Sequence, residues 1–478
     1  MIARWDDGLV VVVKRECPTC ALVVPVLGAL RAAGMPLAVV SQDDPAFPPG
    51  LEPIDDRALE TSYGLRLTTV PTLVRFADGR EVTRTEGWDR AEWERITGVA
   101  GLGPGLPAFR PGCGSRTVEP GIAEALAARF GNRLRSRRVE PGADEDEAEF
   151  FFDRGWTDGL PVVPPTPERV VCMLDGTTRA PEDVVAVVPP DLVECTVEKV
   201  AVSAVMAGCR PEYLPVVIAA VEAACSDAWN AHGVLATTWF AGPVIVVNGP
   251  VAKRIGMNAG INCLGQGNRA NATIGRALQL VIRNVGGGRP GEVDRATLGY
   301  PGKYTFCFAE REDDSPWEPL ATERAGLAPG TSAVTLFAGS GVQGLADQLS
   351  RTPESLARSF AACLRVTFHP KLVLGFDAML VVSPEHARVF REAGWTKARL
   401  RQELDALLLI PGSELVHGAG GIAEGVPARL EGATLPKFRP GGLLIVHAGG
   451  GAGLFSAIIG GWASGQLGSE PVTREIRT

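Results

Sequence analysis

The sequence contains no long apolar run and no basic patch interleaved with aromatic residues. A membrane-spanning helix needs about 20 consecutive apolar residues, and no run here approaches that length. With 47 Lys and Arg against 55 Asp and Glu, the net charge of −8 argues against a nucleic-acid partner. The N-terminus lacks the apolar core of a signal peptide. We therefore expect a cytoplasmic protein that binds neither membrane nor nucleic acid.

Metal and nucleotide motifs are also missing. The five histidines, His232, His369, His386, His417 and His447, lie far apart and form neither H-x-H nor H-E-x-x-H. The sequence has no Walker A motif and no G-x-G-x-x-G motif, and the absence of G-x-S-x-G disfavours a hydrolase of that class. Few residues follow the last glycine-rich turn, too few for a dinucleotide-binding half. We expect no metal and no cofactor.

What the sequence does contain is one C-x-x-C motif, Cys17-Pro18-Thr19-Cys20, among ten cysteines. The motif follows the apolar run 9–13 and opens a helical pattern over 21–33. A helix N-terminus favours a thiolate, so Cys17 is the candidate attacking sulfur and Cys20, one turn later, the resolving sulfur. The alternative is half of a zinc site, but no second C-x-x-C and no nearby histidine completes it.

Residues 1–100 resemble thioredoxin. The resemblance rests on a strand followed by the C-x-x-C helix, and on Thr69-Val70-Pro71-Thr72 before a hairpin and a closing helix. It implies that Pro71 is cis and lies against the dithiol, where it shapes a substrate groove. The dipeptide between the cysteines is Pro-Thr rather than the Gly-Pro of thioredoxin. The direction of electron flow is therefore left open.

Residues 101–118 are rich in glycine and proline and are predicted to form a linker. Cys113 lies near its end in the sequence Gly-Cys-Gly-Ser. It could be the disulfide partner of the dithiol or a second nucleophile. The alternative is an inert thiol, since most lone cysteines behave as small apolar residues.

The rest of the chain contains four distinctive strings, which are Gly155-Trp-Thr-Asp-Gly-Leu-Pro-Val-Val-Pro-Pro-Thr166, Met206-Ala-Gly-Cys-Arg-Pro-Glu-Tyr213, Gly267-Asn-Arg-Ala-Asn271 and Gly299-Tyr-Pro-Gly-Lys303. With these strings, residues 113–478 resemble a bacterial family of unassigned function. Its members are often encoded beside small selenocysteine or cysteine proteins with a U-G-S-C motif. The resemblance implies thiol or selenol chemistry nearby and a possible thiol or selenol protein as partner.

Residues 119–478 are predicted to form a large α/β domain with mixed sheets and glycine-rich loops. Val244 to Lys253 and Met379 to Arg388 share one pattern, a buried strand, a capping Asn or Ser, and proline at a helix start. This suggests two related halves, about 155–340 and 341–478, or a repeated local solution. A third strand, 442–447, is followed by a glycine-rich turn and an apolar segment that we expect to be helical up to Ile459.

The best binding-site candidate in the large domain is the loop before the helix that starts at 272. Its glycines allow close approach, its side chains supply hydrogen bonds and one fixed charge, and the helix N-terminus attracts an anion. The expected substrate-binding residues are Asn258, Asn262, Cys263, Asn268, Arg269 and Asn271, with His232 from another polar segment. Replacing Arg269 or Asn271 by alanine should weaken anion binding without unfolding the protein. The alternative is a loop that satisfies its own backbone.

His447 ends a predicted strand and faces the glycine-rich turn, the usual ligand position in open α/β sheets. It is the candidate acid or base of the large domain. The alternative is a hydrogen-bonded structural histidine.

These observations suggest a thiol-dependent oxidoreductase in which the Cys17/Cys20 dithiol exchanges electrons with a large domain that binds a small, polar, anionic substrate. One alternative is a lyase or transferase in the large domain, with the dithiol keeping a cysteine reduced. Another is a non-catalytic redox partner that docks a separate thiol or selenol protein. The sequence leaves the substrate and the oligomeric state open.

Overall fold

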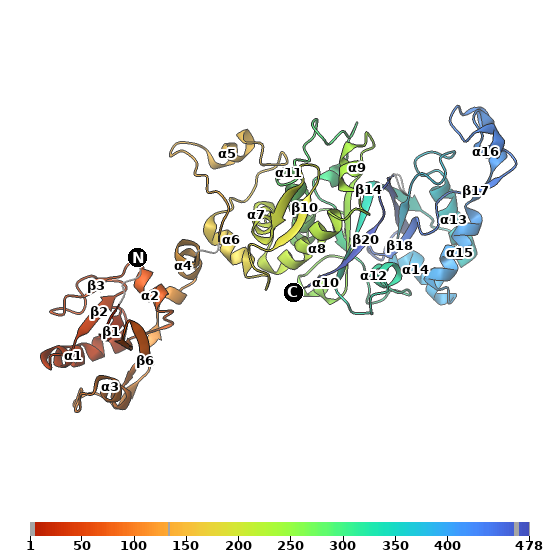
Figure 1. Ribbon diagram of the computed structural model, residues 1–478. Coiled ribbons are helices and arrows are strands. Elements are labelled where there is room, and N and C mark those ends of the chain that lie inside the picture. Colours follow the sequence, from red (N-terminus) through yellow and green to blue (C-terminus); the bar gives the residue numbers. More distant parts are fainter. Residues whose placement is uncertain (1–4, 132–133, 463–467, 478) are drawn as a thin grey trace. The chain divides into compact units, whose positions relative to one another are not determined.

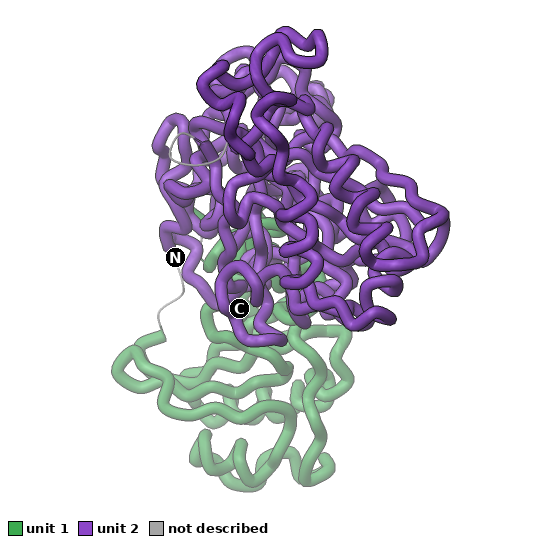
Figure 2. Tube along the Cα trace, turned by 90° about the vertical axis from the view of Figure 1, so that its right-hand side faces the viewer, with its two compact units in different colours: residues 1–134, 167–171 green, residues 135–166, 172–478 purple. Residues whose placement is uncertain are grey.

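The chain folds into two compact units. The computed structural model describes residues 5–131, 134–462 and 468–477. The N-terminal unit comprises residues 1–134 and 167–171, and the large unit comprises residues 135–166 and 172–478 (Figure 2). Among the described residues, no helix has both the length and the apolar character that a membrane crossing requires.

The N-terminal unit is built on a mixed five-stranded sheet with the order β3-β2-β1-β5-β6 (Figure 1). Strand β1 is parallel to β2 and antiparallel to β5. The elements of this sheet and its helices are β1 (Gly8–Val13), α1 (Pro18–Ala32), β2 (Leu37–Ser41), β3 (Ile54–Asp55), α2 (Glu60–Gly64), β5 (Thr72–Ala77), β6 (Arg80–Glu86), α3 (Arg90–Thr97) and α4 (Ile122–Phe130). A mixed sheet with the Cys17/Cys20 pair beside it is consistent with the thioredoxin-like domain that the sequence suggests.

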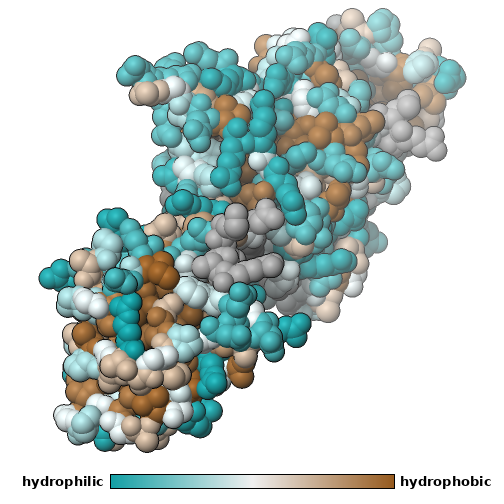
Figure 3. Space-filling model, turned by 60° about the vertical axis from the view of Figure 1, so that its left-hand side comes forward, coloured by the Kyte–Doolittle hydropathy of each residue, from teal (hydrophilic) through white to brown (hydrophobic). Residues whose placement is uncertain are grey.

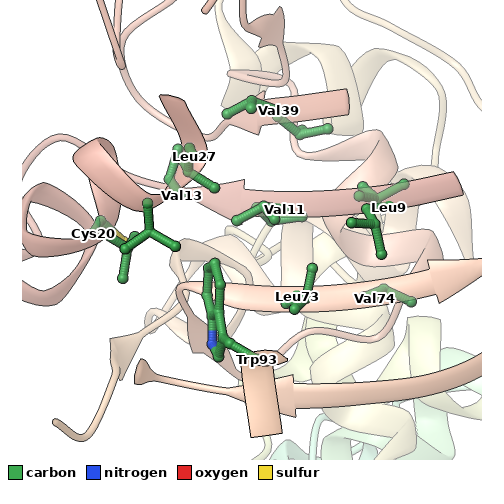
Figure 4. Packing of buried hydrophobic residues seen from close by; sticks show 14 of the residues in the cluster. Leu9, Val11, Val13, Cys20, Leu27, Val39, Leu73, Val74 and Trp93 are labelled. Carbon is green, nitrogen blue, oxygen red and sulfur yellow. The ribbon is translucent and has the colours of Figure 1, made fainter. Parts of the chain in front are cut away.

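Strand β1 forms the centre of the N-terminal core. Its residues from Leu9 to Val13 are all buried, as expected for an apolar run with strands on both sides and both faces covered. Leu27 of α1, Leu73 of β5 and Trp93 of α3 pack in the same cluster (Figure 4). Cys20 belongs to this cluster as well. The second sulfur of the dithiol is therefore part of the apolar core.

Residues 101–118, which we expected to be a linker, are folded within the N-terminal unit. Strand β8 (Phe109–Arg110) pairs antiparallel with β7 (Trp88–Asp89). Strand β9 (Cys113–Gly114) pairs antiparallel with β4 (Thr69–Val70). We call residues 101–118 the strap.

Side chains of the N-terminal unit hold the strap at both of its ends. Trp88 Nε1 donates to the carbonyl of Pro107 at 2.7 Å, early in the strap. Gln42 Nε2 donates to Ser115 Oγ at 2.7 Å, near its end. Because these donors are buried or half-buried, leaving them unpaired would cost about 1–3 kcal/mol each. The strap is thus an integral part of this unit, despite its glycine and proline content.

The large unit combines a seven-stranded sheet, several helices and two small two-stranded sheets. The elements before the main sheet are α5 (Glu147–Asp153), β10 (Val184–Val188), β11 (Val193–Thr196), α7 (Val197–Ala207), α8 (Leu214–Ala224) and α9 (Ala231–Ala236). Helix α6 (Pro167–Leu174) is divided between the two units. The elements that follow are β12 (Gly242–Asn248), α10 (Pro250–Arg254), α11 (Arg269–Asn284), β13 (Cys307–Ala309), α12 (Leu320–Ala325), β14 (Ala333–Ala346), α13 (Pro353–Arg365), β15 (Ala378–Val382), α14 (Pro384–Glu392), α15 (Lys397–Leu407), β16 (Leu409–Pro411), α16 (Gly412–Leu415), β17 (Thr434–Pro436), β18 (Leu443–His447), β19 (Phe455–Gly461) and β20 (Val472–Glu475).

The main sheet is mixed and curls into a half-barrel. Its order is β13-β12-β14-β19-β15-β18, with β20 paired to the first part of β14. Strand β14 is long, and its register shifts between Gly339 and Val342, so that its first part pairs with β12 and its second part with β19. Such an irregularity bends a strand and increases its twist. Strands from both of the suggested halves therefore share one sheet.

Two expectations from the sequence have different outcomes. The strands and the prolines of the repeated pattern are confirmed, since β12 leads to α10 and β15 leads to α14, each helix with proline at its first position. The expected capping side chains are wrong, because Gly249 is the N-cap of α10 and Ser383, at the N-cap of α14, makes no side-chain hydrogen bond there. The helix expected up to Ile459 is wrong, because this segment is strand β19, paired with β14 and β15. A short apolar run fits a buried strand as well as a helix. Here the hydrogen-bonded pairing with a strand on each side shows that the run is a strand.

A buried carboxylate connects the ends of two strands. Glu310 follows β13 directly, is fully buried, and accepts hydrogen bonds from Asn248 Nδ2 at 2.7 Å and from the N–H of Leu320 at 2.7 Å. The N–H of Arg311 donates to the carbonyl of His447 at 2.7 Å. These bonds bring the carboxyl ends of β12, β13 and β18 together at one place.

On the side drawn in Figure 3, hydrophobic residues lie in separate patches among hydrophilic ones. Among the described residues, the most exposed large apolar ones are Leu349 at 89%, Ile261 at 81% and Leu298 at 81%. Single exposed apolar residues are ordinary and require no partner.

Candidate functional site

Cys17 occupies the N-cap position of α1. Its Sγ accepts a hydrogen bond from the N–H of Cys20 at 3.3 Å. Pro18 takes the first helical position, where its missing N–H removes no hydrogen bond. The backbone donors and the partial positive charge of the helix end both favour a thiolate at this sulfur.

Cys20 lies one turn further along and is buried, with its Sγ accepting a hydrogen bond from the N–H of Lys14 at 3.4 Å. The Sγ of Cys17 is 3.5 Å from the carbonyl oxygen of Val70. The Val70–Pro71 peptide bond is cis, as the resemblance to thioredoxin implies. The structure therefore brings Cys17, Cys20 and Pro71 together.

The strap adds a third thiol to this group. Cys113 pairs with Val70 in the β4–β9 bridge, and its thiol is one of the groups that lower the pKa of Cys17. Thr19 Oγ1, between the two cysteines of the motif, donates to the carbonyl of Pro111 at 2.7 Å. The strap thus crosses the start of α1 and holds Cys113 beside the dithiol.

Sequence reasoning missed Gly112, the residue that allows the strap to lie close to β4. A Cβ at Gly112 would lie 2.4 Å from Thr69 Cγ2 and 2.7 Å from the Val70 carbonyl oxygen, too short for any side chain. A Cβ at Gly87, whose φ is +73°, would lie 2.8 Å from the Gly112 nitrogen. The sequence signal was available, because Gly112 directly precedes the Gly-Cys-Gly-Ser cysteine. It becomes informative only once the strap's partner strand is known.

The surroundings lower the pKa of Cys17 to about 5. The largest cause is a hydrogen bond from the Cys20 thiol to the Cys17 sulfur, which burial opposes. The Cys113 thiol and the backbone N–H groups of Cys20 and Thr19 stabilise the thiolate further. At neutral pH, Cys17 is therefore the ionised and nucleophilic sulfur, while its two neighbours are protonated donors.

The other cysteines with a resolved shift all have raised pKa values. Burial is the main cause for Cys20 and for Cys113, and the ionised Cys17 nearby raises both further. In the large unit, burial raises the pKa of Cys263 to about 11 and that of Cys209 to about 12. These thiols are poor nucleophiles at neutral pH.

The reactivity of Cys17 should follow its ionisation. Its alkylation rate with iodoacetamide, measured by peptide mass mapping of the reduced protein, should be half-maximal near pH 5. In Cys113→Ala the midpoint should move to higher pH, because one donor to the thiolate is lost. A midpoint near that of a free cysteine, about 8.5, in the unmodified protein would contradict this assignment.

The loop that we expected to bind an anion uses its asparagines to brace itself. Asn271 is buried, donates to the carbonyls of Asn258 and Cys263, and accepts from the N–H of Asn258. Asn268 caps α11 and donates to the carbonyl of Gly256, and Asn262 donates to the carbonyl of Gln266. These bonds are those of a loop that satisfies its own backbone, the alternative left open by the sequence.

The other expected binding residues lie in different settings. Arg269 is exposed, and its Nε donates to the carbonyl of Gly208 at 2.9 Å. Cys263 is buried at the bottom of the loop, and His232 is exposed on α9. The N–H of Gly449 donates to the carbonyl of Ala259 at 2.9 Å, which joins this loop to the glycine-rich turn after His447.

These contacts change the expected effect of the two loop substitutions. Asn271→Ala should lower the free energy of unfolding by about 1–3 kcal/mol, since it leaves buried backbone groups unpaired. Arg269→Ala should change it by less than about 0.5 kcal/mol, because the side chain is exposed. Urea unfolding of both full-length variants measures the difference. Equal and small effects would show that Asn271 does not brace the loop.

His447 lies at the carboxyl end of β18, as predicted, but is almost completely buried. Its Nδ1 is 2.9 Å from the carbonyl oxygen of Val382, which can only accept, so the proton is on Nδ1. Nε2 is 3.7 Å from a carboxylate oxygen of Asp314. Burial lowers the pKa of His447, against the opposing effect of Asp314. The ring is thus a neutral, hydrogen-bonded histidine in this structure.

The described residues contain no group of three or more His, Cys, Asp or Glu side chains placed to hold a metal ion. No family model matches the chain. No curated protein matches it either.

Proposed function

We propose that the protein is a thiol-dependent oxidoreductase whose N-terminal unit is a thioredoxin-like exchange domain. The observation that carries the proposal is the environment of Cys17, a sulfur with a pKa of about 5 at a helix N-cap. A second thiol, Cys20, donates to it from the next turn, and a third, Cys113, from the strap. A low-pKa thiol with neighbouring protonated thiols is what disulfide exchange requires.

The reaction begins with attack of the Cys17 thiolate on a client disulfide. The client S–S bond breaks, a new bond joins Cys17 Sγ to one client sulfur, and the other client sulfur leaves and takes up a proton. Cys20 or Cys113 then loses its proton and attacks Cys17 Sγ, which releases the second client sulfur as a thiol. Two electrons pass to the client, and an external dithiol reductant restores the enzyme. The reverse sequence oxidises a client dithiol.

The different positions of Cys20 and Cys113 favour different roles for these two resolving thiols. Cys20 is fully buried in the core cluster and is fixed by its helix. Cys113 is half-buried and lies on a two-residue strand, so it is the more accessible thiol. We assign Cys20 as the resolving thiol of the dithiol and Cys113 as a resident partner that forms its own disulfide with Cys17.

The strap restricts access to the same sulfur. It pairs with the backbone of β4 where an extended client peptide would add as a strand. A client must therefore displace the strap, or receive its electrons through Cys113. In the full proposal, the large unit binds a small anionic substrate and the dithiol supplies or removes its two electrons.

A trapping experiment tests the role of Cys113. In Cys20→Ser under mild oxidation, peptide mapping should find a disulfide between Cys17 and Cys113, because Cys113 is paired with Val70, whose carbonyl oxygen is 3.5 Å from Cys17 Sγ. Cys20→Ser with Cys113→Ala is the control and should leave Cys17 alkylatable. If Cys17 joins Cys263 or no cysteine of this chain, Cys113 is not its partner.

A glycine substitution tests the strap. Gly112→Ala should increase the rate at which the reduced protein cleaves a disulfide-bonded peptide by several-fold, because a methyl group at this position forces the strap away from β4. Gly105→Ala is the matched control, since a Cβ there meets no atom within 4 Å. Equal rates for the two variants would show that the strap does not limit access. Circular dichroism checks that both remain folded.

The same assays separate the alternative functions. Turnover that persists in Cys17→Ser without added dithiothreitol would place the activity in the large unit alone, as in a lyase or transferase. Stable capture of a separate thiol or selenol protein by Cys20→Ser, without turnover of any small substrate, would indicate a docking partner.

A further inference from the structure

Unpaired polar atoms gather at the end of α11, away from the asparagine loop at its start. Four buried side-chain atoms in residues 279–289 have no hydrogen-bond partner, namely Gln279 Nε2, Arg283 Nε, Asn284 Oδ1 and Arg289 Nε. They are four of the twelve such atoms found in the described part of the chain. Buried polar groups are almost always paired, so these four atoms require partners outside the protein chain, either water or a bound ligand.

Another arginine of the same helix has hydrogen-bond partners within the chain. Arg276 forms two hydrogen bonds of 2.8 Å with the carboxylate of Asp158 and further bonds with the carbonyls of Leu160 and Pro161. Asn284 Nδ2, two turns later, donates to the carbonyl of Trp156 at 2.9 Å. The segment 156–161 therefore lies along this face of α11, and its carboxylate is already engaged by Arg276.

Arg283 and Arg289 have no such acceptor. In the described part of the chain, the buried Nε atom of each guanidinium has no hydrogen-bond partner. Burial lowers the pKa of Arg283, and the charge of Arg289 lowers it further, against the attraction of Asp158 and Glu292. The two partly buried like charges repel each other, and an anion between them would offset that repulsion.

The loop after α11 is built to keep Arg289 close to the helix. A Cβ at Gly286 would lie 2.5 Å from the Pro189 carbonyl oxygen, and one at Gly288 would lie 2.8 Å from Ile282 Cγ2. Gly287 has a φ of +76°, and its carbonyl accepts from the N–H of Arg289 at 2.8 Å. Three consecutive glycines thus allow a tight turn that returns Arg289 towards α11.

We propose that Arg283 and Arg289 bind a small organic dianion, with Gln279 donating to it. The unpaired Asn284 Oδ1 is an acceptor, so the ligand also carries a hydroxyl or amino donor. Arg is the side chain best suited to carboxylate and phosphate oxygens, because its planar donors can bind two of them at once. The proposal gives the substrate class of the proposed function and the residues that select it, and it moves the anion site from the start of α11 to its end.

The test is direct binding, measured by isothermal titration on the full-length chain. The probes are glycerol 3-phosphate and malate, one a phosphate and the other a dicarboxylate, each with a hydroxyl group. The protein carries Cys17→Ser and Cys20→Ser, so the result does not depend on thiol chemistry. Binding without any redox activity would leave this site intact and refute only the proposed function.

Arg283→Met and Arg289→Met should each weaken binding of the preferred probe at least tenfold. Arg358→Met is the matched control, since Arg358 is an exposed arginine on α13, and it should bind within twofold of the parent. The melting temperature of ligand-free Arg283→Met should not fall, because the substitution removes an unpaired charge. Failure of the parent to bind either probe, or unchanged binding by both site variants, would overturn the proposal.

Discussion

The chemistry of the N-terminal unit depends on one short backbone pairing, the antiparallel bridge between β4 and β9. It places Cys113 opposite Val70, whose carbonyl oxygen is 3.5 Å from Cys17 Sγ. Without this bridge the centre would be an ordinary dithiol at a helix start. With it, a third thiol donates to the same sulfur and the strap covers the strand edge beside the dithiol. Gly112 makes the bridge possible, because no side chain fits between the strap and β4.

The three sulfurs have different ionisation states for a simple electrostatic reason. Hydrogen bonds from thiols and backbone N–H groups converge on Cys17 and stabilise its negative charge. Burial then makes a second thiolate unfavourable at Cys20 and Cys113, and the charge on Cys17 adds to that effect. One nucleophile and two proton-bearing partners are thus set by position alone.

The large unit is organised around α11 and the curled sheet. Three of the distinctive strings of the sequence meet at this helix, because Asp158 binds Arg276 and the carbonyl of Gly208 accepts from Arg269. At the start of the helix, the asparagine side chains form hydrogen bonds with backbone groups of their own loop. At its end, the buried Nε atoms of Arg283 and Arg289 have no hydrogen-bond partner in the described part of the chain.

The sequence by itself determined the features that depend on local pattern. These are the buried run of β1, the C-x-x-C at the start of α1, the proline at the start of α10 and of α14, and the α/β class. Only the tertiary structure decided that residues 101–118 are a strap, that residues 455–461 are a strand, and that the asparagines of the loop brace it. Each of these results depends on a partner distant in sequence, since glycine-rich, apolar and asparagine-rich segments fit more than one local conformation. Arg276 binds Asp158, which lies more than one hundred positions away, and no local pattern reveals such a pairing. With Asp158 engaged in this way, the Nε atoms of Arg283 and Arg289 have no partner in the described part of the chain.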